Sequence, residues 1–323
     1  MNRRTFVVVG VGNFGSWWAL GLLKVPGPVT VFCLDPDRQS RSRLGERLNV
    51  VPARLFDEST VAFVDVPEEL PPYSDAVVIA TNADVRYRVF CELREVHQSK
   101  QWILEKPLAQ SVVETEGYTA IEHPENLYVN HSRPLQPASM VLRSILDSFG
   151  LPRSVQLRGG NYELANNATH FVHLASSLLR TNFTEVSRAE LSERWHESST
   201  RPGFLDVAGS ITVALEGDVE VVFDWSEPNR RKSEWTFCFR DHCVTYCELS
   251  GEIRSQGKLI ATVPLVNFSS LVPQIVEANE SAVPMAGLPR LLAVLPIHRA
   301  LTEVLAEHYG RSIGRDAGLV PFG

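Results

Sequence analysis

Short apolar runs alternate with amphipathic stretches up to about Asn130. The apolar runs have the length of buried strands, and one of them is rich in β-branched residues, as parallel strands require. The predicted strands are Thr5–Val9, Val29–Leu34, Val61–Val64, Asp75–Thr81, Gln101–Leu104 and Asn126–Asn130. The predicted helices are Phe14–Leu23, Asp84–His97 and Ser111–Ile121, and a polar, Arg-rich stretch covers Arg38–Leu48. This alternation predicts βαβ units around a parallel sheet.

The pattern changes beyond residue 131. Helices are predicted over Pro137–Phe149, His170–Leu179, Ser269–Glu277 and Leu288–His308. The strands predicted between them are Pro152–Arg158, Leu205–Leu215, Asp218–Trp225, Glu234–Phe239, His242–Glu248 and Leu259–Val263. Consecutive strands without intervening helices indicate an antiparallel sheet. We therefore expect an α/β domain over residues 1–131 and an α+β domain over residues 132–323, with one large, mainly antiparallel open sheet.

Composition and charge narrow the functional classes. Two domains suit 323 residues, and a hydrophobic content of 44% is enough for sizeable cores. The net charge of −7 argues against binding to nucleic acid or to an anionic membrane surface. No apolar run approaches the roughly 20 residues of a membrane span, and the N-terminus does not read as a signal peptide. We expect a cytoplasmic protein whose five cysteines are reduced.

A glycine motif follows the first predicted strand. Gly10, Gly12 and Gly15 match G-x-G-x-x-G, with Asn13 and Phe14 inside the motif. A strand precedes it, a helix follows it, and Asp35 stands 20 residues later at the end of the next strand. This context is the Rossmann dinucleotide-binding fingerprint, in which the helix N-terminus receives the pyrophosphate. The alternative is a strand–helix turn that binds no ligand.

The residue after the second strand bears on the choice of cofactor. A carboxylate at Asp35 would accept hydrogen bonds from the adenosine ribose and repel a 2′-phosphate, which favours NAD over NADP. The alternative is a solvated Asp that opens a turn. Arg38, Arg41 and Arg43 follow closely, and one of them would allow NADP to bind.

Thr81 and Asn82 end the run Asp75–Ala80. Ligands bind at the carboxyl ends of strands in open α/β sheets, so both residues are candidates to line the ribose or nicotinamide. The alternative is a polar cap for the helix that follows.

Several features together resemble the Gfo/Idh/MocA family of oxidoreductases. They are the glycine fingerprint, the triplet Glu105-Lys106-Pro107 followed by Leu108-Ala109, the strand Leu127–Asn130 with Arg133 behind it, and a helix-borne histidine. The matches all lie before residue 180, and the rest agrees in architecture alone. The resemblance implies a nicotinamide cofactor, a sugar-like substrate, and dimers or tetramers that pair through the second sheet.

The resemblance also assigns roles to the triplet. Lys106 would lie beside the nicotinamide and the substrate hydroxyl, where it would hold the oxygen or, with a lowered pKa, transfer its proton. Glu105 would position Lys106 and the nicotinamide end of the cofactor. The alternative for these neighbours is a solvated ion pair.

The second family signature is a polar residue, usually Asp, four positions before a histidine. Asn166 and His170 match it, and His173 stands where an Asp often follows. Residues three and four apart share a helix face, so all three are substrate-binding candidates, with His170 also catalytic. Asn166 cannot act as a base, and its similarity to some nucleotide-sugar enzymes favours an amino or nucleotide sugar. The alternative is a structural pair of buried histidines.

Three further features are weaker. Arg133 would bind a substrate phosphate or carboxylate, or is an ordinary surface arginine. Tyr162 is a further substrate-binding candidate. Cys238, His242, Cys243 and Cys247 lack paired C-x-x-C knuckles, so we expect no metal site there.

Taken together, these features predict hydride transfer between nicotinamide and a carbinol or keto carbon of a sugar. The rival prediction is a non-catalytic regulator or sensor with the same fold. Asn166 favours the regulator, whereas Lys106 and His170 favour the enzyme.

Overall fold

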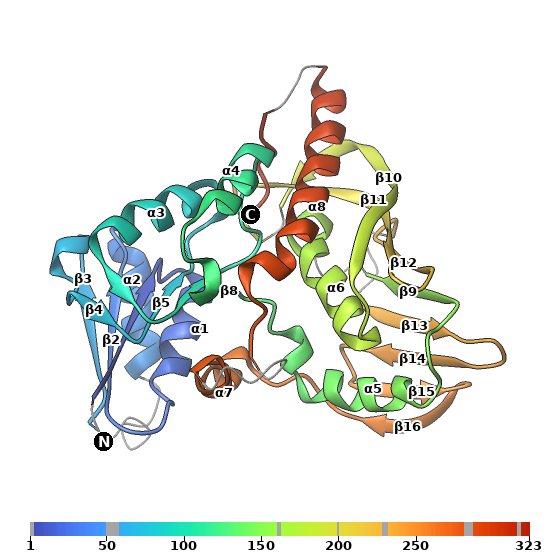
Figure 1. The fold of residues 1–323 in the computed structure, drawn as a ribbon, viewed down its shortest axis with the longest axis horizontal. Helices are drawn as coiled ribbons and strands as arrows, with labels where there is room; N and C mark the ends of the chain where they lie inside the picture. Colours follow the sequence, from blue (N-terminus) through green and yellow to red (C-terminus); the bar gives the residue numbers. More distant parts are fainter. Residues whose placement is uncertain are drawn as a thin grey trace. The chain divides into compact units, whose positions relative to one another are not determined.

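The computed structural model describes residues 3–49, 58–159, 163–198, 200–227, 232–280, 287–314 and 318–323. The chain divides into two compact units (Figure 1). Unit 1 comprises Met1–Leu108, Ile121–Asn130 and Asn267–Ala293, and unit 2 comprises Ala109–Ala120, His131–Val266 and Val294–Gly323. The chain crosses between the units at several points, one of them between Asn130 and His131. The units are not continuous in sequence, because residues 267–293 return to unit 1.

Unit 1 is a Rossmann-type α/β unit. Its parallel strands are β1 (Arg4–Val9), β2 (Val29–Leu34), β3 (Thr60–Val64), β5 (Ala76–Ile79), β7 (Trp102–Leu104) and β8 (Leu127–Val129). They lie in the order β3-β2-β1-β5-β7-β8, and the two-residue strands β4 (Tyr73–Ser74) and β6 (Gln98–Ser99) pair separately. The order reverses direction between β1 and β5. Ligands of open α/β sheets bind at such a switch point, beyond the carboxyl ends of the strands.

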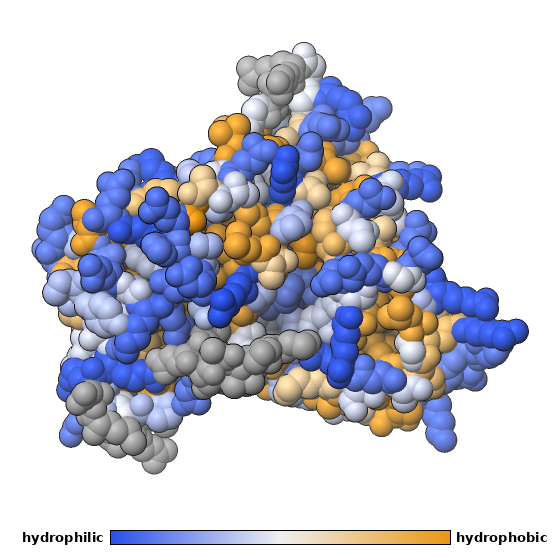
Figure 2. Space-filling model, viewed as in Figure 1, coloured by the Kyte–Doolittle hydropathy of each residue, from blue (hydrophilic) through white to orange (hydrophobic). Residues whose placement is uncertain are grey.

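The longer helices of unit 1 are α1 (Asn13–Leu22), α2 (Arg38–Asn49), α3 (Ala83–Val96) and α7 (Phe268–Glu280). Helix α2 buries only Ser40 and Leu44, and hydrophilic side chains dominate the visible surface over α2 and α3 (Figure 2).

Helix α7 explains why residues 267–293 belong to unit 1. It packs beside α1, and the rings of Phe14 and Phe268 lie 4.8 Å apart (Figure 1). A side chain at Gly21 would collide with Val272, so a glycine in α1 permits this approach. This packing joins residues more than 200 positions apart in the sequence, which a local pattern cannot reveal.

Unit 2 contains the predicted open, mainly antiparallel sheet. Its strands are β9 (Ser154–Arg158), β10 (Phe183–Glu197), β11 (Leu205–Leu215), β12 (Val219–Asp224), β13 (Glu234–Cys238), β14 (Cys243–Cys247), β15 (Glu252–Ser255) and β16 (Lys258–Thr262). The order is β10-β11-β12-β9-β13-β14-β15-β16, and β9 with β12 is its parallel pair. Helices α5 (Pro137–Asp147) and α6 (Leu164–Leu179) lie along one face, with α4 (Val112–Gly117) and α8 (Leu291–Ile313) nearby (Figure 1). One apolar core, which includes Phe171, Phe223 and Trp235, fills the space between helices and sheet.

Among the described residues, the larger differences from the sequence prediction are the strands β10 and β15 and the start of helix α6. Strand β10 was not predicted, because it lies at the sheet edge and none of its residues is fully buried. Strand β15 was also missed, because it buries one residue, Ile253. Helix α6 begins at Leu164, six residues before the predicted His170, because the Asp206 carboxylate accepts from the N–H groups of Leu164 and Ala165.

We predict that Gly15→Ala destabilises the protein. The added Cβ would lie 1.9 Å from the Gly10 carbonyl oxygen. The cost should approach about 3 kcal/mol, the upper range for overpacking, because the clash is with backbone. Gly45→Ala is the control: its Cβ meets no atom within 4 Å, and α2 should gain about 0.5–1 kcal/mol. Chemical denaturation measures both, and equal stabilities for the two variants would contradict the prediction.

Candidate functional site

The glycine turn connects β1 to α1 in unit 1. Gly10 adopts a φ of +81°, a conformation that L side chains rarely adopt, and Gly15 packs directly against it. An added Cβ at Gly12 would meet no atom of the described residues within 4 Å, so they leave the turn open at this point. Helix α1 starts at Asn13 with no side-chain cap and no acidic residue in its first turn. These features suit a phosphate at the helix N-terminus.

Both oxygens of the Asp35 carboxylate accept backbone hydrogen bonds. The N–H of Val11 donates to Oδ2 at 2.7 Å, and the N–H of Asp37 donates to Oδ1 at 2.9 Å. Asp35 therefore holds the turn between β1 and α1 at the end of β2, where the fingerprint requires an acidic residue.

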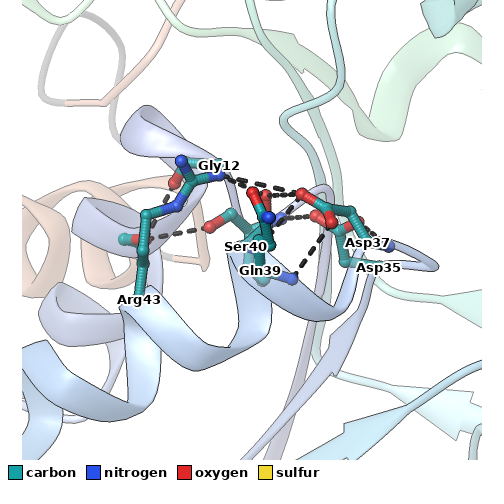
Figure 3. Close-up of polar contacts among 8 residues, drawn as sticks. Gly12, Asp35, Asp37, Gln39, Ser40 and Arg43 are labelled. Atoms are coloured by element: carbon teal, nitrogen blue, oxygen red, sulfur yellow. Dashed lines mark hydrogen bonds and ion pairs between the residues drawn. The ribbon is translucent and has the colours of Figure 1, made fainter.

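A second carboxylate, that of Asp37, lies beside Asp35 (Figure 3). Asp37 accepts from the Ser40 hydroxyl at 2.7 Å and from the N–H of Gln39 at 3.0 Å, so it caps α2. The Ser40 hydrogen bond leads the interactions that lower the Asp37 pKa. Arg43 donates to Ser40 Oγ at 2.9 Å. Of the other arginines, Arg41 pairs with Asp65, and Arg38 is exposed at the start of α2.

The residues after β5 are polar and incompletely paired. Thr81 Oγ1 is buried without a hydrogen-bond partner among the described residues. Asn82 occupies the N-cap position of α3, yet its side chain makes no capping hydrogen bond. The capping interpretation therefore lacks its defining contact, and both side chains remain candidates for a ligand.

Glu105 and Lys106 follow β7 at the same edge of the sheet, and both are buried. Glu105 Oε1 accepts from Trp18 Nε1 at 2.6 Å and from Asn130 Nδ2 at 2.5 Å. Burial raises the pKa of the Glu105 carboxyl, while these two donors, Arg86 and Lys106 oppose the rise. Burial rules out the alternative of a solvated Glu–Lys pair.

The backbone around Lys106 is also held. The Lys106–Pro107 peptide bond is cis, and the guanidinium of Arg86 donates to the carbonyl oxygens of Pro107 and Thr81. Arg86 thus connects the segment after β5 to the segment after β7. These contacts determine where the backbone of Lys106 lies.

Four histidines of unit 2 lie close together, and three of them, His131, His170 and His298, are buried. His170 Nδ1 lies 3.1 Å from His131 Nδ1, and His131 Nε2 lies 2.9 Å from His298 Nε2. The ring of His173 is 4.9 Å from that of His131. His170 and His173 therefore share a helix face, as predicted, and both approach a third histidine, His131.

The two other predicted side chains in unit 2 have partners. Asn166 Oδ1 accepts from Arg201 Nη1 at 3.2 Å. Arg133 donates to Glu248 Oε1 at 2.9 Å, and its guanidinium lies 4.5 Å from the centre of the Phe171 ring. Arg133 is therefore a half-buried ion-pair residue rather than an ordinary surface arginine. Tyr162 lies outside the described residues.

The cysteines of unit 2 lie on neighbouring strands. Cys238 and Cys243 face each other across β13 and β14 with their sulfurs 2.6 Å apart, whereas Cys247 lies opposite Glu234. Within the described ranges, no group of three or more His, Cys, Asp or Glu side chains is arranged to hold a metal ion. In the same part of the chain, no helix has both the length and the apolar character needed to cross a membrane.

Sequence reasoning overlooked several of these residues. Asn130 and His131 received no individual role, although the segment Asn130–Arg133 resembles a substrate-contacting segment of the Gfo/Idh/MocA family. His298 received no role, and Trp18 mainly a packing role. His298 had a recognisable signal, because it is a polar residue inside the apolar segment Leu291–Leu301. The contacts of Trp18 and Asn130 with Glu105 had none, since they join residues 87 and 25 positions apart.

Comparison with known proteins identifies the class of fold. A Rossmann-type unit with a second unit built on a mainly antiparallel sheet also occurs in solved oxidoreductase structures. No protein-family profile and no curated protein sequence matches the chain.

Three solved structures represent the match. UDP-N-acetylglucosamine 3-dehydrogenase from Acidithiobacillus ferrooxidans is 14% identical with a TM-score of 0.67, over 98% of this chain and 99% of that one. An Agrobacterium radiobacter oxidoreductase in complex with NAD⁺, L-tartaric acid and magnesium is 15% identical with a TM-score of 0.67, over 97% of this chain and 98% of that one. A super-repressor mutant of Gal80p from Saccharomyces cerevisiae is 15% identical with a TM-score of 0.68, over 97% of each chain. At these identities, the comparison shows the fold.

We predict that Glu105→Ala destabilises the protein far more than Glu105→Gln. The alanine leaves Trp18 Nε1 and Asn130 Nδ2 buried without their acceptor, at about 1–3 kcal/mol each. The loss should total about 2–5 kcal/mol, whereas glutamine keeps an acceptor oxygen for both donors. Urea titration followed by tryptophan fluorescence measures the difference. Equal losses in the two variants would show that the hydrogen bonds do not determine the effect.

We also predict opposite pH effects from two groups in unit 2. Burial, with help from Arg143, lowers the His173 pKa from 6.5 to about 4, and His173 Nδ1 is buried without a partner among the described residues. Between these values the unfolded chain binds more protons, so this contribution to stability falls as pH falls. Burial raises the Asp206 pKa from 3.8 to about 6, so its contribution rises as pH falls through the same window.

The pH effects are separated by two variants. Between pH 7 and pH 5, His173→Gln should reduce the loss of unfolding free energy by about 1–2 kcal/mol, and Asp206→Asn should increase it by about 1 kcal/mol. Denaturant titrations at several pH values measure this. Identical pH dependence in both variants and the natural protein would contradict it.

Proposed function

We propose that the chain is an NAD-dependent oxidoreductase of the Gfo/Idh/MocA type that acts on a sugar or a sugar derivative. The observation on which the proposal rests is the buried Lys106, next to Glu105. It follows β7 at the sheet edge where the glycine turn follows β1. A buried ammonium at this edge suits a role on a ligand better than a role in solubility.

The cofactor half of the proposal concerns unit 1. Gly10, Gly12 and Gly15, together with the first residues of α1, Asn13 and Phe14, would hold the pyrophosphate. The open space beside Gly12 and the uncapped start of α1 fit that group.

Other residues would bind the adenosine ribose and the nicotinamide ends of the dinucleotide. Asp35 would receive the adenosine ribose, with Arg38 at the rim, and Thr81, Asn82 and Glu105 would line the nicotinamide side. Thr81 Oγ1 supports this assignment, because it is buried and has no hydrogen-bond partner in the described part of the chain. The two carboxylates Asp35 and Asp37 favour NAD over NADP, because both would repel a 2′-phosphate.

The reaction needs a proton carrier and a group that holds the substrate oxygen. When bound, the dinucleotide supplies a two-electron hydride acceptor or donor. Lys106 would hold the substrate oxygen, and His170 would accept or return the hydroxyl proton. Asn166, His173, Arg133 and Tyr162 are the proposed substrate contacts. Arg133 and Asn166 already have protein partners, so a ligand would share them with Glu248 and Arg201.

The substrate class has one further support. UDP-N-acetylglucosamine 3-dehydrogenase, which shares the fold, acts on a nucleotide sugar by its name. The Asn166 form of the helix signature favours the same class by resemblance. We therefore place nucleotide and amino sugars first among candidate substrates.

The second candidate function is a non-catalytic dinucleotide-binding regulator or sensor. Asn166, which cannot ionise, favours it, and so does the similarity to Gal80p, whose structure is that of a super-repressor mutant. The buried Lys106 and His170 favour the enzyme, because a sensor needs neither a buried ammonium nor an imidazole.

We also propose that the chain forms a dimer or tetramer through the outer face of the sheet in unit 2. Alternate residues of β11 and β12 point away from the helices and are partly accessible, among them Thr212, Ala214 and Val222. Thr212, Ala214 and Val222 are small or apolar, which suits a covered surface, and the charged Glu220 and Asp224 flank Val222 on β12.

We predict that Lys106→Met lowers turnover by about 10²–10⁴-fold, the range for loss of one acid–base group, while NAD affinity changes only a few-fold. Gly12→Ala should instead affect the cofactor: NAD binding should weaken at least about tenfold, because the added Cβ would occupy the space proposed for the phosphates.

Gly45→Ala is the control for both the Lys106→Met and the Gly12→Ala variants.

The substrate must first be found by a thermal-shift screen of nucleotide sugars, sugar phosphates and inositols with NAD present. Turnover retained in Lys106→Met would remove Lys106 from its proposed role. NAD binding without turnover of any stabilising ligand would favour the sensor.

A further inference from the structure

We propose that His131 and His298 form a proton relay with His170, so that His170 alternates between acid and base through two neighbouring imidazoles. The proposal rests on the proposed acid–base role of His170. The relay connects three parts of unit 2: the segment after β8, helix α6 and helix α8.

The geometry places His131 at the centre. Its Nδ1 lies 3.1 Å from His170 Nδ1, and its Nε2 lies 2.9 Å from His298 Nε2. Both distances are those of hydrogen bonds. His131 and His298 are each only 1% exposed, so both bonds are largely shielded from water. Because Nδ1 is the ring nitrogen of His170 that contacts His131, we assign the proposed exchange with substrate to the other nitrogen, Nε2.

If all three imidazoles are neutral, their ring protons can occupy the two N···N hydrogen bonds in only two arrangements. A neutral imidazole carries one N–H, and each N···N bond needs one donor and one acceptor. In the first arrangement, His298 Nε2–H donates to His131 Nε2, and His131 Nδ1–H donates to His170 Nδ1. His170 then carries its proton on Nε2. In the second, both bonds reverse, His298 carries its proton on Nδ1, and His170 Nε2 is an unprotonated base.

A proton transfer through the relay balances without an outside acceptor. The substrate hydroxyl gives its proton to His170 Nε2 as its carbon gives a hydride to the proposed NAD. His170 passes its Nδ1 proton to His131 Nδ1, and His131 passes its Nε2 proton to His298 Nε2. His298 then holds both ring protons and the positive charge, and His170 and His131 stay neutral. The reverse reaction returns the protons along the same bonds.

Asn166, one helical turn before His170, explains why His170 needs a partner other than the usual acidic residue of the signature. A carboxylate beside a catalytic histidine selects its tautomer and stabilises its cation. Asn166 is an amide that cannot ionise, and its Oδ1 accepts from Arg201. In the relay, His131 selects the tautomer of His170, and His298 takes up the charge.

The resting protein provides a test that does not depend on activity. With ¹⁵N-labelled histidine, long-range ¹H–¹⁵N correlation spectra measure the protonated fraction of each ring nitrogen. The relay requires equal fractions of His131 Nδ1–H, His170 Nε2–H and His298 Nε2–H in the natural protein. Unequal fractions, or a doubly protonated His131 at neutral pH, would overturn the proposal.

Two matched ring substitutions extend the test. His298→Phe removes the end of the relay and should change the tautomer ratio of His170. His173→Phe makes the same exchange for a ring 4.9 Å from His131 that is not a member of the relay, and should leave that ratio unchanged. An unchanged ratio in His298→Phe, or an equal change in His173→Phe, would contradict the relay. If His298→Phe does not fold, the fractions in the natural protein still decide.

Kinetics separate the relay from a structural role. His298→Phe should lower kcat about tenfold, but cause no further loss when His170 is already Gln, because His298 acts through His170. Additive losses would assign His298 a structural role and overturn the proposal. Full kcat in His170→Gln alone would contradict the proposed function of His170, and the spectra would still test the relay.

Discussion

The carboxylate of Glu105 has to be satisfied inside unit 1, and the candidate cofactor site is built around that requirement. A buried carboxylate without partners is costly, so its neighbours must provide donors. Trp18 comes from α1, Asn130 from the end of β8, and Glu105 itself from the end of β7. One oxygen atom thus joins the helix that begins at the glycine turn to two strand ends of the sheet. The position of Lys106 depends on this junction, because it is the next residue.

Unit 2 solves a related problem with imidazoles. Its buried polar group is made of histidines from three separate segments, and His131 bonds to two of them at once. Imidazoles can satisfy one another because each nitrogen can donate or accept, whereas carboxylates brought together would repel. Burial also keeps His173 neutral, because it disfavours the charged imidazolium and so lowers the His173 pKa. Three neutral histidines joined by two N···N hydrogen bonds have two proton arrangements, which is what a relay needs.

Acidic side chains fix the starts of the helices that carry the candidate site residues. Asp206 on β11 caps α6 and so determines where the helix with His170 begins. Asp37 caps α2, and Asp35 holds the turn before α1. In each case an acidic side chain accepts from helix or turn N–H groups that would otherwise lack partners. Helix α7 packs against α1 through Gly21 and the Phe14–Phe268 contact, and so completes unit 1.

The sequence alone determined the alternating βαβ pattern, the glycine fingerprint with Asp35, the open antiparallel sheet and the position of Lys106 after a strand. These features depend on local periodicity and on motifs with short, regular spacing, so they can be read along the chain. The tertiary structure decided which side chains meet. Strand β10 escaped prediction because its pairing with β11, rather than an apolar pattern, forms it. The bonds of Glu105 to Trp18 and of His131 to His298 join residues 87 and 167 positions apart. Such contacts depend on how the elements pack, and no local pattern encodes them.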